Sequence, residues 1–222
     1  MENIDEYSSD STISNLSNSK DSSLLFETEE LIYIKKPYEL YPNIQSITST
    51  LNLGCFLNLK TISQKIRTSE MSLNNKSSLI IKTKNNNIIN TLYQNGKIIS
   101  IGAKSEKEAK SNCLKIAKMI KKCGFETNIK DYKIQNIIAN YDINFGLNLN
   151  NLYTNICEYN NINNNIYCKY EKDIFPGLII NINGINITIF ETGKIVIAGA
   201  KNKKDIEKIF NQIYPLLNEA KT

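Results

Sequence analysis

The chain has 222 residues, of which 41% are hydrophobic and 22% are charged, enough for a compact core but too little for several independent domains. It contains no histidine, which excludes Ser-His-Asp and Cys-His nucleophile pairs and every zinc site that uses histidine. Residues 1–36 carry eight acidic and three basic side chains, a net charge of −5. Because the whole chain has a net charge of +5, residues 37–222 have a net charge of +10. This basic body indicates a polyanionic partner.

The acidic N-terminal segment differs from the rest of the chain in composition. Residues 1–36 are rich in Ser, Asn and acidic side chains and hold few large apolar groups, so we expect a mostly disordered tail. It lacks the basic and apolar regions of a signal peptide. No apolar run in the chain approaches the roughly 18 residues of a membrane span, and we expect no membrane contact.

Cysteine spacing bears on redox and metal chemistry. The five cysteines, Cys55, Cys113, Cys123, Cys157 and Cys168, are scattered singly with no C-x-x-C pair. We therefore expect no disulfide framework and no metal site, and we favour a reducing, intracellular compartment.

An internal repeat spans the body of the chain. The matching blocks are Ile44-Gln45 with Ile134-Gln135, Leu57-Asn58-Leu59 with Leu147-Asn148-Leu149, and Gly96-Lys97-Ile98 with Gly193-Lys194-Ile195. The first two pairs lie 90 residues apart and the third 97. We place the extra residues of the second copy in an inserted polar loop at residues 158–169. We therefore predict a first repeat at residues 37–130 and a second repeat at residues 131–222.

Each copy has the same expected order of strand, helix, several strands and a long closing helix. In the first copy we expect these elements at residues 44–53, 57–66, 78–83, 88–93, 97–101 and 105–123. In the second copy we expect them at residues 133–143, 147–156, 178–182, 185–190, 194–198 and 202–218. Gly96 and Gly193 fall where hairpin turns need a positive φ. The first closing helix is amphipathic, with Ala109, Cys113 and Ile116 among its inward residues.

Several strands are apolar on both of their faces. Residues 178–180 and 195–198 are apolar at every position, yet about four helices can cover only one face of the sheet. We infer that one sheet face is left for a partner. The alternative is that both faces are buried inside the fold.

Six ordered blocks resemble the conserved core of the TATA-box-binding protein family, across about residues 40–222. They lie at residues 51–55, 59–62, 102–106, 132–136, 175–179 and 192–196. The resemblance implies an α+β fold in which two pseudo-symmetric repeats form one curved antiparallel sheet, a saddle with helices on its convex face. It further implies a nuclear, non-enzymatic transcription initiation factor that binds the DNA minor groove with its concave face, without catalytic residues, cofactor or metal.

The second repeat matches the family's DNA-contacting positions well. The resemblance implies that Asn136 donates to base acceptors and that Ile138 belongs to the apolar floor. It implies that Phe175 and Phe190 are the family's wedges, whose unstacking of base steps is known for TATA-box-binding proteins and carried over here. Leu178 and Val196 lie beside them, and Ala198 replaces a usual Thr. Ordinary core packing is the alternative for these residues.

The first repeat departs further from the family pattern. Ser46 stands at the position of a central Asn and can donate, but with a shorter reach. One wedge position keeps an aromatic residue, Tyr93, whereas the other falls on Lys76, which cannot unstack bases as Phe does. The remaining positions hold Thr48 for a Val, Ile101 for a Thr, and the apolar Leu79 and Ile99. The resemblance therefore predicts a weaker kink at this end.

Charged residues complete the implied surfaces. Five lysines stand at or near family positions that flank the DNA phosphates: Lys82, Lys97, Lys104, Lys194 and Lys201. The resemblance implies that they add affinity by releasing counterions from the DNA. The acidic loop with Glu171, Asp173 and Ile174 matches the place where the family docks the TFIIB-type factor. A lysine-rich helix face, Lys115, Lys118, Lys121 and Lys122, resembles the family's regulator-binding helix. A merely solvated surface is the alternative for the lysines.

Two functions follow from these features. The leading hypothesis is a general initiation factor that binds and bends A/T-rich, TATA-type promoter DNA and recruits the TFIIB-type factor and RNA polymerase machinery. The alternative is a protein scaffold of the same family with weakened DNA bending, which acts mainly through protein partners. In either case two copies could dimerise through the concave face.

Overall fold

The computed structural model of the chain describes residues 41–72, 77–83, 87–163 and 166–222. They belong to one of two units, which span residues 1–35 and 36–222. The predicted tail and Lys76 lie outside the described residues, so the expectations for them stay predictions.

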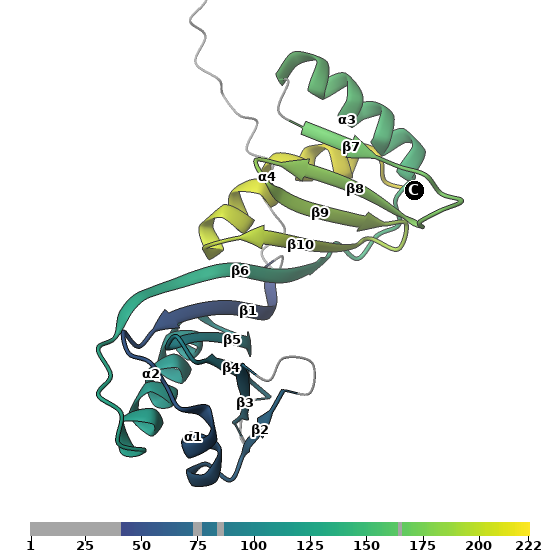
Figure 1. The fold of residues 1–222 in the computed structure, drawn as a ribbon. Helices are drawn as coiled ribbons and strands as arrows, with labels where there is room; N and C mark the ends of the chain where they lie inside the picture. Colours follow the sequence, from purple (N-terminus) through teal and green to yellow (C-terminus); the bar gives the residue numbers. More distant parts are fainter. Residues whose placement is uncertain (1–40, 73–76, 84–86, 164–165) are drawn as a thin grey trace, which may run out of the picture. The chain divides into compact units, whose positions relative to one another are not determined.

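The predicted repeat is confirmed in the order of the elements (Figure 1). The first copy contains β1 (Asn43–Asn52), α1 (Leu59–Lys65), β2 (Ser69–Met71), β3 (Ser78–Lys82), β4 (Ile89–Tyr93), β5 (Lys97–Ala103) and α2 (Glu106–Lys122). The second contains β6 (Lys130–Asp142), α3 (Leu149–Asn163), β7 (Ile166–Lys169), β8 (Gly177–Ile182), β9 (Ile185–Phe190), β10 (Lys194–Ala200) and α4 (Lys203–Glu219). The limits 37–130 and 131–222 stay a prediction.

The ten strands of the described residues join one curved antiparallel sheet in the order β2-β3-β4-β5-β1-β6-β10-β9-β8-β7. The two copies meet where β1 pairs with β6. At this seam Ile47 pairs with Ile137, its own counterpart 90 residues later, and Thr48 pairs with Asn136. The reciprocal pair is Ser46 with Ile138, so the seam has the isologous pattern of a twofold interface. The predicted α+β fold with two pseudo-symmetric repeats is confirmed.

The helices cover one face of the sheet. Helix α2 contacts β1 and β5, α4 contacts β10, and α3 contacts β7 and α4. The inward residues predicted for α2, including Ala109, Cys113 and Ile116, are fully buried. Along β9, Ile185, Ile187 and Ile189 are buried against this layer, and the residues between them are not. This alternation defines a second sheet face, which we call the underside.

The expected inserted loop at residues 158–169 is wrong. Helix α3 continues through Asn163, and residues 166–169 form the edge strand β7, which pairs with β8. Asparagine has a low helix propensity, but tertiary packing overrides it. Here Leu152 and Ile156 anchor α3 in the core, and the additional residues lengthen an existing helix.

A buried polar network distinguishes the first repeat. Asn112 on α2 donates from Nδ2 to Asn90 Oδ1 (2.6 Å) and to Ser100 Oγ (2.7 Å). Ser100 Oγ in turn donates to Asn90 Oδ1 (2.7 Å). All three residues are at most 5% exposed. Their counterparts 97 residues later are all isoleucine: Ile187, Ile197 and Ile209.

Two further observations concern the predictions from composition. All five cysteines are free thiols. Among the helices of the described residues, none combines the length and the apolar character needed to cross a lipid bilayer.

Candidate nucleic-acid interface

The underside is formed by alternate residues of eight strands, β1, β3, β4, β5, β6, β8, β9 and β10, because directly paired residues of antiparallel strands share a face. In the first repeat the pairing places on it Ser46, Thr48, Thr50, Ile80, Lys82, Ile89, Thr91, Tyr93, Ile99 and Ile101. In the second repeat it places there Asn136, Ile138, Asn140, Ile179, Asn181, Asn186, Thr188, Phe190, Val196 and Ala198. The surface combines aliphatic groups with small hydrogen-bonding side chains.

Two residues predicted to contact DNA lie on the other face. Leu79 and Leu178 are fully buried in the helix-side cores, and their placement at the interface is corrected. Successive strand residues point to opposite faces, so the next residues, Ile80 and Ile179, occupy the underside instead.

Phe175 and Phe190 form an aromatic pair at the outer end of the second repeat. Their ring centroids are 6.0 Å apart and their planes meet at 60°. Both rings lie over Gly177, which pairs with Phe190 across β8 and β9. A Cβ on Gly177 would lie 2.7 Å from Cε1 of Phe175 and 3.1 Å from Cε1 of Phe190. Glycine is therefore required for this close packing of the rings.

We expect Gly177→Ala to displace the Phe175 ring while the fold persists, because this ring is 38% exposed and can move outward. The measurement is the nuclear Overhauser effect between the Phe175 and Phe190 ring protons, which should weaken or vanish. The midpoint of thermal unfolding is the control and should change little. An unchanged ring-to-ring signal would contradict the role assigned to Gly177.

Asn136 is held as a hydrogen-bond donor at the centre of the underside. Its Oδ1 accepts a hydrogen bond from the backbone N–H of Gly199 at 2.7 Å. Gly199 has a φ of +109° and lies at a bulge of β10, a backbone conformation that favours glycine. Because its oxygen is engaged, Asn136 presents Nδ2 for donation. Ser46, at the equivalent position of the first repeat, has a shorter side chain.

The five lysines predicted to flank phosphates are all exposed. Lys97 and Lys194 begin β5 and β10 at the two hairpins, and Lys104 and Lys201 follow the same strands. Lys82 differs, because its Nζ lies 3.4 Å from Glu70 Oε2. This exposed ion pair partly neutralises the charge that Lys82 offers to a phosphate.

The loop predicted to bind a protein partner precedes Phe175. Backbone N–H groups of Ile174 and Phe175 donate to Glu171 O at 3.0 and 2.9 Å, which closes a tight turn. A hydrogen bond to Glu171 raises the pKa of Lys169, and one to Glu191 raises the pKa of Lys172. Asp173 and Ile174 are exposed, and Ile174 shows 79% of its surface. The four α2 lysines, Lys115, Lys118, Lys121 and Lys122, are also exposed.

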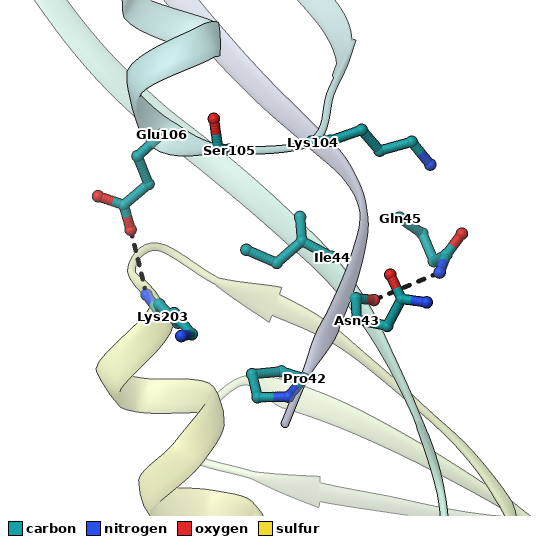
Figure 2. Close-up of a pocket in the computed structure, with 8 residues that line it drawn as sticks. All are labelled: Pro42, Asn43, Ile44, Gln45, Lys104, Ser105, Glu106 and Lys203. Carbon is teal, nitrogen blue, oxygen red and sulfur yellow. Dashed lines mark hydrogen bonds between the residues drawn. The ribbon is translucent and has the colours of Figure 1, made fainter. Parts of the chain in front are cut away.

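Two cavities adjoin the seam and the underside. The first, of about 590 Å³, lies at the start of β1, where Glu106 Oε1 accepts a hydrogen bond of 3.2 Å from the backbone N–H of Lys203 (Figure 2). The carboxylate at the start of α2 thereby caps α4. The second, of about 790 Å³, lies between Phe190, Lys194 and Val196. Its lining also includes Asn140 of the underside and Tyr141 and Ile195 of the helix-side core.

Several underside residues were not predicted from the sequence, namely Ile80, Thr91, Ile179, Asn186 and Thr188. They can be found in the sequence because every second residue of a strand points to the same face, so residues two and four positions before Tyr93 or Phe190 share the face of that aromatic residue. Counting back from Phe190 by two gives Thr188 and Asn186, both of which the structure places on the underside.

Comparisons with known proteins agree with this architecture. The family model described as "Transcription factor TFIID (or TATA-binding protein, TBP)" matches residues 41–123 and 131–220. The TATA-box-binding protein of Acanthamoeba castellanii is 36% identical over 189 residues, which cover 84% of this chain and 70% of that protein. TATA-box-binding protein 1 of Arabidopsis thaliana is 36% identical over 188 residues, which cover 83% and 90%.

A solved structure shares the fold. Methanococcus jannaschii TBP superposes with a TM-score of 0.66 at 24% identity, covering 81% of this chain and 99% of the other. The repeated fold and its open sheet face define a protein of the saddle class. The chain belongs to the TATA-box-binding protein family, a family of transcription factors and not of enzymes.

Proposed function

We propose that the chain binds the minor groove of A/T-rich promoter DNA with its underside, bends the duplex, and presents it to a TFIIB-type factor and the RNA polymerase machinery. The observation that carries this proposal is the open underside. The helices of the described residues pack on the opposite face, while aliphatic and small hydrogen-bonding side chains line the underside. Because the chain belongs to a family named for the TATA box, we infer that its ligand is TATA-type DNA.

The chemistry of the underside suits the minor groove. An A·T pair exposes only acceptors there, whereas a G·C pair adds the amino group of guanine. The Nδ2 donor of Asn136 complements the acceptors, and the aliphatic side chains around it contact the groove floor. Bending costs several kcal/mol by the usual elastic estimates. Apolar contact along the underside and the charge of Lys97, Lys104, Lys194 and Lys201 offset this cost.

We expect Phe175→Ala to weaken binding of a TATAAA duplex about 10- to 100-fold, because stacking of an aromatic ring on a base contributes about 1–3 kcal/mol. Tyr93→Ala should have a smaller effect, since the family resemblance predicts the weaker kink at that end. Fluorescence anisotropy measures the affinity at two salt concentrations, and energy transfer between dyes at the duplex ends measures bending. Tyr153→Ala is the matched control, because Tyr153 lies on α3 and is 37% exposed against 38% for Phe175.

The outcome separates the proposal from its alternative. Tight, bent and A/T-selective binding that falls at higher salt supports promoter binding. Equal, weak and unbent binding to TATAAA and G·C-rich duplexes would overturn it. A scaffold that acts through protein partners is the second candidate, favoured by the ion pair that occupies Lys82 and by Ser46 and Ala198 at the centre. Tight binding of a TFIIB-type factor without DNA would support that candidate.

We also propose the partners and location that accompany this function. The exposed Asp173 and Ile174 next to the aromatic pair offer a charged and an apolar contact to a basic TFIIB-type factor. The site of action is the nucleus, in keeping with a family of transcription factors. Without DNA, the apolar underside favours a homodimer through the concave face, which sedimentation at several protein concentrations tests.

A further inference from the structure

The two halves of the underside differ in chemistry at equivalent positions. In the first repeat Ile89 pairs with Ile101 across β4 and β5, and these side chains are 46% and 45% exposed. In the second repeat, 97 residues later, Asn186 pairs with Ala198 across β9 and β10. Asn186 is also exposed. An aliphatic ridge on one half therefore corresponds to a carboxamide on the other.

Hydrogen bonds fix which end of the Asn186 amide faces outward. The backbone N–H of Gly184 donates to Asn181 Oδ1 at 3.2 Å, which assigns the oxygen of Asn181 to the turn. The Nδ2 of Asn181 then donates to Asn186 Oδ1 at 2.7 Å. With its oxygen engaged, Asn186 offers Nδ2 and its two hydrogens on the underside.

A donor at this position discriminates between base pairs. Adenine N3 and thymine O2 are acceptors in the minor groove, whereas the guanine amino group is a donor that would oppose Nδ2. The aliphatic pair Ile89 and Ile101 supplies contact area but no hydrogen bond. The second repeat thus carries two outward amide donors, Asn136 and Asn186, on the same face.

We propose that Asn186 is a specificity-determining residue of the DNA-binding face, whose Nδ2 donates to a base acceptor in the minor groove beneath the second repeat. The inference rests on the proposed function, since it names a contact within that interface. Because Ile89 holds the equivalent place, the contact has no counterpart in the first half.

Deleting acceptors one at a time in the duplex tests the contact. Each adenine is replaced in turn by 3-deazaadenine, which lacks the N3 acceptor, and each thymine by difluorotoluene, whose fluorine is a poor acceptor. The full chain should lose about five- to tenfold in affinity at the position that Asn186 contacts, the low end of the range for a good base contact because only one hydrogen bond is lost. The Asn186→Val variant should lose this sensitivity at that position only. Asn211→Ala, which removes an exposed amide from α4, is the control and should keep the full pattern.

Each outcome has a distinct meaning. If the unaltered chain binds A/T-rich and G·C-rich duplexes equally, the proposed function fails before this inference is reached. If it binds selectively but Asn186→Val keeps the same acceptor pattern, the inference is overturned. A lowered unfolding midpoint with an unchanged pattern would likewise overturn it, because the Asn181–Asn186 pair would then only stabilise the hairpin.

Discussion

Replacing Asn112 by alanine is expected to lower the free energy of unfolding by about 2–4 kcal/mol. The change removes both hydrogen bonds that Asn112 donates and leaves Asn90 and Ser100 with fewer partners in a fully buried site. It also leaves a cavity under α2. Urea denaturation followed by circular dichroism measures the loss.

The second repeat provides the matched control for this prediction. The equivalent positions there hold only apolar side chains, those of Ile187, Ile197 and Ile209. The fold therefore accepts an entirely apolar core at this place. The triple variant Asn90→Leu, Ser100→Ala and Asn112→Leu removes the three polar side chains together and replaces each Asn by a residue with the same number of heavy atoms. It also removes the hydrogen bond that Asn90 Nδ2 donates to the backbone oxygen of Ile81 (3.2 Å). It should recover most of the loss, since replacing a whole buried polar set is often close to neutral. A triple variant no more stable than Asn112→Ala would refute this account.

Gly193→Ala is expected to cost about 2–4 kcal/mol of unfolding free energy, for two reasons that add. The residue has a φ of +82° at the β9–β10 hairpin, where an L side chain is strained. Its new Cβ would also clash with the backbone oxygen of Phe145 and lie 3.0 Å from Ile143 Cγ1. The backbone there cannot easily retreat, because Ile143 N donates to Gly193 O at 3.1 Å. Thermal and urea unfolding both report the change.

Gly184→Ala separates the two contributions. Gly184 has a nearly equal φ of +80°, but no atom lies within 4 Å of a Cβ added there. Its substitution should cost about 1 kcal/mol, the price of the backbone conformation alone. If the two variants are equally destabilised, the close approach to Phe145 contributes nothing. Gly96, which approaches Cys55 O in the first repeat at a φ of +80°, should behave like Gly193.

The elements that could be predicted from the sequence are those with a strong period or a repeated counterpart. The prediction of the closing helix around Cys113 and Ile116 is confirmed, because its apolar residues recur at helical spacing. The strands of the second repeat were found because similar runs occur 97 residues earlier. The extension of α3 to Asn163 differs from the expectation because its Asn-rich sequence favours a loop locally, whereas the helix as a whole packs against β7 and α4.

The face of each strand was harder to predict than its position. A shift of one residue moves every side chain of a strand to the opposite face, and strand residues 178–180 are apolar throughout. Leu178 could be excluded from the underside only once Gly177 was seen to pair with Phe190. The buried polar network also could not be predicted from the sequence. Asparagine is usually exposed, and only the fold brings Asn90 and Asn112 together.

The symmetry of the seam has a consequence for the origin of the chain. A protein made of one repeat would leave the ten-residue strand β1 as an open edge with unpaired backbone groups. Since Ile47 faces its own counterpart Ile137, two separate copies would satisfy that edge by pairing about a true twofold axis. Gene duplication joins such copies permanently and releases each from the need to match the other. The replacement of Asn90, Ser100 and Asn112 by isoleucines in the other half is the kind of divergence that this release permits.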